Sequence, residues 1–364
     1  MTHSIVIGGG IIGMLTAWNL HNSGHRVTVI ERGQTGRESS WAGGGIVSPL
    51  YPWRYHDAIS SLANYGQQHY PEICRILADQ TGIDPEYTEN GLIIIAPEEE
   101  LLAVKWSERY FPSLDLVQAK QVSQLEPGMR TSDTSAIWMP AIAQVRNPRI
   151  AKSLAKMLKN LNIDVITDTE ITSFTENNGQ LTGIKSVDRN FVADNYVVCS
   201  GAWTGDLLHQ TGLDLAIKPV KGQMILFKGA PNDIKRIVLE EDRYIIPRRD
   251  GRILFGSTVE HSGFDKAISQ SAKQELHDIA VERFPVLKDK QIEHHWAGLR
   301  PGSPDGIPVI GQHPELENLY INAGHFRNGV ILGPGSCKLI TSLINGQSDE
   351  LNNPVFSPAG LKSS

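Results

Sequence analysis

Cysteine is scarce in this chain of 364 residues, which contains only Cys74, Cys199 and Cys337. Three widely separated cysteines fit neither a disulfide framework nor the ligand spacing of a metal cluster. We therefore expect all three thiols to be reduced and structural, and we predict no metal site.

The chain also lacks a long apolar run and a large excess of charge of one sign. It contains no stretch of about eighteen consecutive apolar residues, and no basic leader or cleavage site precedes the first predicted strand. The formal net charge of −6 gives no electrostatic reason to expect nucleic acid or an anionic membrane as a partner. We therefore expect a cytoplasmic protein without stable membrane insertion that acts on a small molecule. The sequence leaves the oligomeric state open, a homo-oligomer included.

What the chain does contain is a glycine-rich turn directly after an apolar strand. Residues 4–13 read SIVIGGGIIG. In this pattern Gly8 permits a tight turn, Gly10 lets the backbone approach a pyrophosphate, and Gly13 lets the following helix pack closely on the strand. An ordinary tight turn is the alternative, and the order of strand, turn and helix disfavours it.

A second predicted strand, HRVTVIE, ends at Glu31. A helix that begins near Ile11 points its free N–H groups and its positive end at phosphates, and the Glu31 carboxylate can accept hydrogen bonds from ribose hydroxyls. The spacing therefore predicts a nucleotide-binding βαβ unit.

The hydrophobic pattern predicts an α/β fold of two domains, because 364 residues exceed the size at which one core usually keeps growing. Apolar periodicity predicts helices at 58–82 (alternatively a helical hairpin), 148–161 and 329–343, and strands at 91–96, 163–166, 195–199, 223–228, 244–247, 253–257 and 319–323. We expect a discontinuous Rossmann-like nucleotide-binding domain at 1–50, 145–215 and 300–364. The second, α+β domain, built on a mainly antiparallel sheet, is expected at 51–144 and 216–299.

Several blocks, in order along the whole chain, resemble the D-amino-acid oxidase family of flavoproteins. They are GGGIIG from Gly8, GRESSWAGGGI from Gly36, SGAW from Ser200, WAGLRPGSPDG from Trp296 and GHFRNG from Gly324. Within that family they are most similar to the glycine oxidases of thiamine biosynthesis. The resemblance implies FAD as the cofactor. It also implies that the FAD is non-covalent, because the block after Arg300 lacks the cysteine of members that attach flavin covalently.

The resemblance implies a set of cofactor-binding residues. For the adenosine diphosphate half, Ile11 and Ile12 match the pyrophosphate turn, Glu31 and Arg32 match the residues at the ribose, Ser39 and Ser40 match those at the phosphates, and Ile171 matches the adenine position. For the flavin half, Gly44, Gly45 and Ile46 match the segment beside the ring, and Gly201 matches a second turn beside the cofactor. The pyrimidine edge of the flavin is matched by His325, Phe326, Arg327, Asn328, Gly329, Val330 and Ile331. A helix starting near Gly329 would aim its positive end at the flavin atoms where negative charge collects on reduction.

Arg300 is the strongest candidate for binding the substrate. It lies in an apolar, glycine-rich block with no acidic residue before Asp305, and a guanidinium in such a setting favours a bidentate pair with a carboxylate over an ordinary structural ion pair. The resemblance implies that Arg300 binds the α-carboxylate of an amino acid and that the Tyr244 hydroxyl donates a second hydrogen bond to the same carboxylate. It also implies that the main-chain carbonyl of Arg327 accepts a hydrogen bond from the substrate amine.

The implied reaction is oxidative deamination of glycine, and also of sarcosine and small D-amino acids, to the 2-oxo acid, ammonia or an amine, and hydrogen peroxide. No catalytic acid or base is predicted, since an amine that binds deprotonated needs none. A dehydrogenase of the same fold that uses a quinone or another carrier, a protein that binds FAD without turnover, and an NAD-dependent dehydrogenase are the alternatives. The last of these does not explain the later flavin-like blocks.

Overall fold

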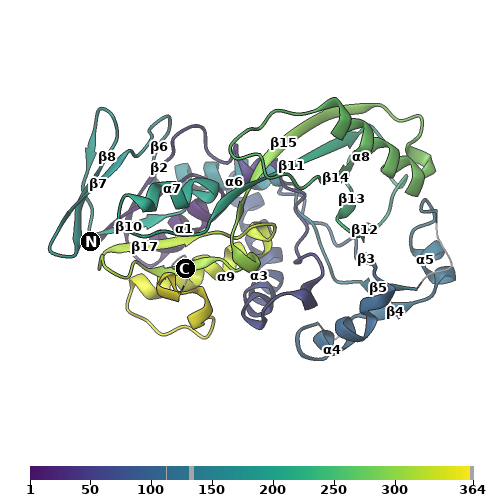
Figure 1. Ribbon diagram of the computed structural model, residues 1–364, viewed down its shortest axis with the longest axis horizontal. Coiled ribbons are helices and arrows are strands. Elements are labelled where there is room, and N and C mark those ends of the chain that lie inside the picture. The colour runs from purple at the N-terminus through teal and green to yellow at the C-terminus, as the bar shows by residue number, and fades with distance from the viewer. Residues whose placement is uncertain (112, 131–134, 361–364) are drawn as a thin grey trace.

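The computed structural model describes residues 1–111, 113–130 and 135–360, which form two large sheets with packed helices and one small sheet (Figure 1). Its helices are α1 (Ile11–Asn22), α2 (Ser39–Ala42), α3 (Asp57–Thr81), α4 (Glu100–Tyr110), α5 (Ala119–Leu125), α6 (Asn147–Asn160), α7 (Thr204–His209), α8 (Gln270–Arg283) and α9 (Gly329–Ile344). In Figure 1 the six-stranded sheet lies on the left and the eight-stranded sheet on the right.

The six-stranded sheet is built from segments far apart in the sequence. Its order is β16 (Val309–Gln312), β17 (Leu319–Ala323), β10 (Asn195–Val198), β1 (His3–Ile7), β2 (Arg26–Ile30) and β6 (Asp164–Ile166), and all neighbours are parallel except β16 and β17. Helices α1, α3, α6 and α9 pack together on one face. Val6 packs in that core while Ile5 and Ile7 pack in the core of the other face. Burial on both faces explains the unbroken apolar runs of these strands.

The eight-stranded sheet is antiparallel apart from the β12 and β3 pair. Its order is β15 (Ile292–Gly302), β11 (Lys218–Phe227), β14 (Ile253–Gly256), β13 (Arg243–Pro247), β12 (Ile237–Glu240), β3 (Leu92–Ile95), β5 (Ala136–Met139) and β4 (Asp115–Val117). Helix α8 packs on one face through Leu276 and Ala280, and Tyr244 and Ile246 belong to the core of the other face. The small sheet is β7 (Ser173–Asn177), β8 (Gln180–Lys185) and β9 (Asn190–Phe191).

The α/β class and the mainly antiparallel second sheet are confirmed. The stretch at 58–82 is a single helix, α3, with Pro71 inside it, and not a hairpin. Helix α8 was not predicted, because its buried residues, Ala272, Leu276 and Ala280, form a stripe only one residue wide. The domain limits remain a prediction, and β15 continues past 299 to Gly302. Among the described residues, no helix combines the length and apolar character needed to span a bilayer.

Candidate functional site

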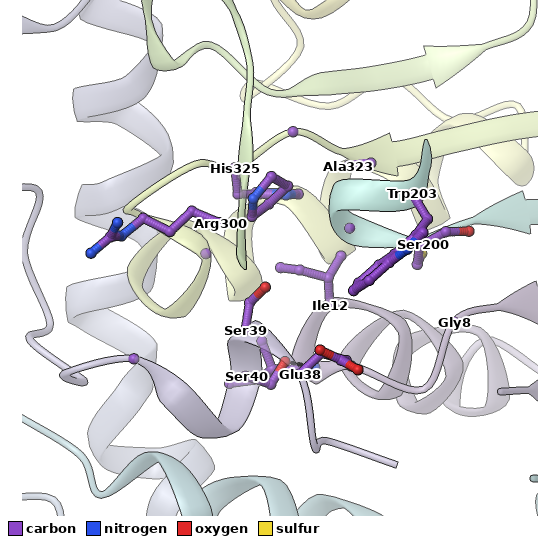
Figure 2. Close-up of a pocket in the computed structure, with 18 of the residues that line it drawn as sticks. Gly8, Ile12, Glu38, Ser39, Ser40, Ser200, Trp203, Arg300, Ala323 and His325 are labelled. Carbon is purple, nitrogen blue, oxygen red and sulfur yellow. Dashed lines mark hydrogen bonds between the residues drawn. The ribbon is translucent and has the colours of Figure 1, made fainter. Parts of the chain in front are cut away.

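A pocket of about 570 Å³ lies between the two large sheets. The carboxyl ends of β1, β2, β10 and β17 form part of its wall, and residues of β13 and β15 line it from the eight-stranded sheet (Figure 2). Open α/β sheets bind ligands outside the carboxyl ends of their strands, and the volume is typical of a small-molecule or cofactor site.

The first glycine turn has the geometry that its sequence predicts. Gly8 has φ of +114°, and a Cβ there would lie 2.5 Å from the carbonyl oxygen of Cys199. A Cβ on Gly13 would lie 1.8 Å from the carbonyl oxygen of Gly8, so α1 packs directly on the turn. The N–H of Ile11 donates to Ser40 Oγ over 2.8 Å. The positive end of α1 therefore faces the pocket beside a serine hydroxyl, which suits an anionic group.

Glu31 and Arg32 lie together on the wall of the pocket. Both carboxylate oxygens of Glu31 accept backbone hydrogen bonds, from the N–H of Gly9 over 2.7 Å and from the N–H of Gly33 over 2.9 Å. The guanidinium of Arg32 stacks 3.6 Å from the centre of the Trp203 ring. A fixed carboxylate beside a stacked cation and indole suits the hydroxyls and flat base of a nucleoside.

The backbone of Gly44 and Gly45 fits a space that leaves no room for side chains. A Cβ on Gly45 would lie 2.0 Å from the carbonyl oxygen of Val145, whose N–H donates to the carbonyl oxygen of Gly45 over 2.8 Å. A Cβ on Gly44 would lie 3.1 Å from Cε2 of Tyr244. The glycines therefore let the main chain itself form the pocket wall next to Tyr244.

Arg300 extends from β15 into the pocket, on the opposite side from Trp203 (Figure 2). Its guanidinium donates to Ser257 Oγ and to the carbonyl oxygen of Thr258, the latter over 3.3 Å. Burial lowers the pKa of Arg300 from its ordinary value, and its side-chain hydrogen bonds within the described chain go to neutral oxygens. A guanidinium with this environment is suited to bind a carboxylate from a ligand.

Tyr244 and Arg327 lie near Arg300. Tyr244 on β13 is 8% exposed and its hydroxyl donates to the sulfur of Met224 over 3.7 Å. The Arg327 guanidinium makes an ion pair with Asp242 over 3.1 Å. The charge of Arg327 contributes to lowering the pKa of Arg300, while Tyr244 raises it. The three residues predicted to bind the substrate are thus brought to one pocket by the fold.

The segment before α9 closes another side of the pocket. His325 is buried, its Nε2 lies 3.0 Å from Ser336 Oγ, and burial lowers its pKa to about 3. The imidazole is therefore neutral at physiological pH. Asn328 precedes the first residue of α9, and neither its side-chain nitrogen nor its side-chain oxygen has a hydrogen-bond partner within the described part of the chain.

Most predicted site residues line this one pocket. They are Gly8, Gly10, Ile11, Ile12, Glu31, Arg32, Ser39, Ser40, Gly44, Gly45, Ile46, Ile171, Gly201, Tyr244, Arg300, His325, Phe326, Arg327, Gly329 and Val330. Gly13, Asn328 and Ile331 lie behind its wall: Gly13 contacts the turn, Asn328 precedes α9, and Ile331 is 1% exposed in the core.

Other lining residues were not singled out from the sequence. They include Asn147, Ser200, Trp203, Ser257, Asn322 and Ala323. Ser200 and Trp203 belong to the SGAW block, which indicated that this segment lies near the cofactor but did not indicate what these two residues do. Nothing in the sequence indicated that Asn147 lines the pocket. Its side-chain nitrogen donates a 3.0 Å hydrogen bond to the carbonyl oxygen of Ser40, which is more than a hundred residues away in the chain.

The fold and the pocket are those of a dinucleotide-binding protein, with the guanidinium of Arg300 in the same pocket. Residues 3–343 match the family described as FAD dependent oxidoreductase. The chain belongs to this family, so it is a flavoprotein oxidoreductase whose cofactor is FAD.

The chain is similar to glycine oxidases over almost its whole length. It is 44% identical to the glycine oxidase of Pseudomonas aeruginosa and 45% identical to that of Pseudomonas putida, in each case over 98% of both chains. The solved structure of glycine oxidase from Geobacillus kaustophilus matches with a TM-score of 0.92 at 26% identity, covering 98% of both chains.

The pocket's own chemistry fits FAD. Gly201 has φ of +57° and a Cβ there would meet no protein atom within 4 Å, so the turn leaves space on the pocket side. Asn147 Oδ1 and Asn322 Oδ1 are buried on lining residues without a partner among the described residues. Buried polar atoms of this kind require a partner, which a polar cofactor provides.

Proposed function

We propose that this FAD-dependent amino-acid oxidase acts on glycine, giving glyoxylate, ammonia and hydrogen peroxide, with sarcosine and small D-amino acids as further substrates. The observation that carries the proposal is Arg300, a partly buried guanidinium in the pocket whose side-chain donors, within the described parts of the chain, bond to neutral oxygens. The identity of 44% and 45% with two glycine oxidases supports the same substrate.

Binding and orientation of the substrate are the protein's part of the reaction. We infer that Arg300 binds the α-carboxylate bidentately while the Tyr244 hydroxyl, freed from the weak contact with Met224, donates a further hydrogen bond to it. The main-chain carbonyl of Arg327 would accept a hydrogen bond from the amine. Two anchors on one carboxylate fix the α-carbon, and holding reacting groups in place supplies a large part of a rate enhancement.

The cofactor supplies the redox chemistry: bound FAD accepts the hydride equivalent of the amino acid and delivers the electrons to oxygen. The protein residues need not remove a proton from carbon. His325, the histidine on the pocket wall, is neutral and bonded to Ser336, so it does not add a positive charge near the amine. An amino group that binds deprotonated is ready to react without a general base.

We also propose a role in thiamine biosynthesis, in which the imine formed from glycine supplies the thiazole ring. The bifunctional ThiO/ThiG protein of Trichormus variabilis, 31% identical, supports this role. The match covers 96% of this chain and 54% of that protein. Three buried cysteines that are free thiols suit the reducing cytoplasm, where we place the enzyme.

The test is reduction and turnover of the FAD-loaded protein with glycine, sarcosine, D-alanine and D-proline. Bleaching of the flavin absorbance by glycine without air, followed by peroxide formation on admission of air, is expected. Bleaching without peroxide would favour a dehydrogenase that uses another acceptor. A flavin that none of the four compounds reduces would refute the proposal.

A further inference from the structure

Arg248 connects the strand that carries Tyr244 to the glycine segment on the pocket wall. It follows β13 directly, and its side chain is partly buried. Its Nη2 donates to the carbonyl oxygen of Gly44 over 2.7 Å. Its Nη1 donates to the carbonyl oxygen of Val145 over 3.1 Å and to Oε1 of Gln144. One planar group is thus shared by β13, the Gly44 segment and the chain that precedes α6.

The oxygens that Arg248 contacts are all uncharged. Burial, and after it the charge of Arg146, lower the pKa of Arg248, while the carboxylates of Glu86 and Asp250, which both form ion pairs with Arg146, raise it. Burial lowers the pKa of Arg248 to about 10, so the group keeps its charge at neutral pH. A positive charge therefore stands directly behind the Gly44 peptide, whose other side faces the pocket.

The hydrogen bond between Arg248 and the Gly44 carbonyl also helps to set the distance between the Gly44 segment and β13, which carries Tyr244. Gly44 is so close to β13 that a Cβ on it would lie 2.8 Å from Cδ1 of Ile246 and 3.1 Å from Cε2 of Tyr244. Val145, held by the same guanidinium, fixes Gly45 through a 2.8 Å hydrogen bond. Among the described residues, the guanidinium supplies the hydrogen bond to the Gly44 carbonyl itself, while Gln144, which bridges to Ile46, gives a second link by donating to the carbonyl oxygen of Pro247 in β13.

We propose that Arg248 is a positioning residue for the oxidation, which fixes the Gly44 and Gly45 backbone relative to Tyr244 and places a positive charge behind the cofactor-facing peptide. The proposal rests on the proposed function only for the identity of the substrate. A reacting atom misplaced by a fraction of an ångström costs rate rather than affinity. A fixed charge close to the flavin favours states of the flavin that carry extra negative charge.

The first test needs no amino acid. Sulfite adds to oxidised flavin and leaves it negatively charged, so its dissociation constant, read from the loss of visible flavin absorbance, reports the electrostatics of the site. In the FAD-loaded Arg248→Met variant we expect this constant to rise about tenfold or more, and in Arg248→Lys by less than about threefold. The matched control is Arg236→Met, since Arg236 also donates to a main-chain carbonyl, that of Asn90, away from the pocket.

The second test separates positioning from binding. In anaerobic rapid mixing with glycine, Arg248→Met should reduce the limiting rate of flavin reduction about tenfold and leave the glycine dissociation constant within about threefold, because Arg300 is intact. Arg248→Lys keeps the positive charge but loses the planar guanidinium that donates to several carbonyl oxygens at once. The limiting rate of flavin reduction in this variant should therefore still fall about threefold.

Several results would overturn the inference. One is an unchanged sulfite constant in Arg248→Met, and another is a change of equal size in Arg236→Met. Should Arg248→Met fail to hold FAD, an unchanged reduction rate in Arg248→Lys would overturn it. A wild-type flavin that glycine does not reduce would refute the proposed substrate, and the sulfite comparison would still decide the role of Arg248.

Discussion

At Gly222 the missing side chain provides the space that Arg300 occupies. A Cβ on Gly222 would lie 2.1 Å from Nη2 of Arg300. Gly222→Ala should therefore displace the guanidinium without removing its charge and raise KM for glycine about tenfold or more, with a smaller effect on kcat. Steady-state peroxide assays measure this. Gly183→Ala, in β8 and outside the pocket lining, is the control for loss of a strand glycine and should leave KM unchanged.

His325 makes stability depend on pH in a defined direction. Its pKa is about 3 in the folded protein against an ordinary value of 6.5, so between these values the unfolded chain binds more protons. Stability is then fully present above pH 6.5 and falls as the pH decreases towards 3, by up to about 1.4 kcal/mol per pH unit.

The measurement is urea unfolding of the wild type and of His325→Gln from pH 7 down to pH 5, all with excess FAD. The variant should lose less stability than the wild type over this range. His261→Gln, at an exposed position, should behave like the wild type. Equal slopes for the wild type and His325→Gln would contradict the prediction.

Among single residues, the sequence predicted those whose role can be inferred from their immediate neighbours in the chain. The blocks around Gly8 and Arg300 predict a tight turn and a bound anion from their composition alone. Gly222 and Arg248 were not predicted, because their importance lies in contacts with Arg300 and Gly44, which are 78 and 204 positions away. The sequence around a strand glycine or a turn arginine does not show which distant residue it contacts.

At the scale of elements, the segment 258–268 reaches from the eight-stranded sheet across to the end of the pocket that Trp203 and Glu38 line. The Phe264 ring stacks on the Trp203 ring with centroids 5.3 Å apart, and Lys266 pairs with Glu38 over 3.0 Å. Trp203 and Glu38 both line the pocket. The segment therefore contacts two residues of the pocket wall from outside the pocket.

Phe264→Ala and Lys266→Ala should each weaken FAD binding. We expect the dissociation constant to rise about tenfold for Phe264→Ala and about threefold for the more exposed ion pair of Lys266. Titration of the apoprotein with FAD, followed by flavin fluorescence, measures the change. Lys290→Ala removes an ion pair with Asp233, neither partner being in the pocket lining, and should leave the constant unchanged. Wild-type affinity in both test variants would be inconsistent with this role.

Elements with a strong apolar period were predicted, and those that depend on a neighbour were not. The run before Gly8 needs no partner to be recognised as a buried strand. By contrast, β15 contains Gly298, Pro301 and Gly302, which are poor strand formers. It is a strand because it pairs along its length with β11, with Val220 opposite Arg300.

At the scale of the whole molecule, FAD should contribute directly to stability, because the pocket is lined by both large sheets. FAD at about 100 times its dissociation constant stabilises the folded state by about 2.7 kcal/mol, which for a chain of this length corresponds to a rise in Tm of about 3.5 °C. Thermal unfolding of apoprotein with increasing FAD measures this. FMN, which lacks the adenosine half, should raise Tm less, and equal shifts would argue against an adenosine-binding role for Arg32 and Trp203.

The sequence by itself determined the α/β class and the dinucleotide turn, and it led to the prediction that Arg300 binds a carboxylate, because each depends on residues close together in the chain. Only the tertiary structure decided which side chains stand behind these residues. Arg248 behind Gly44, Gly222 beneath Arg300, and Phe264 against Trp203 are contacts between distant segments. Such contacts arise from the way the two sheets pack, and no local pattern encodes them.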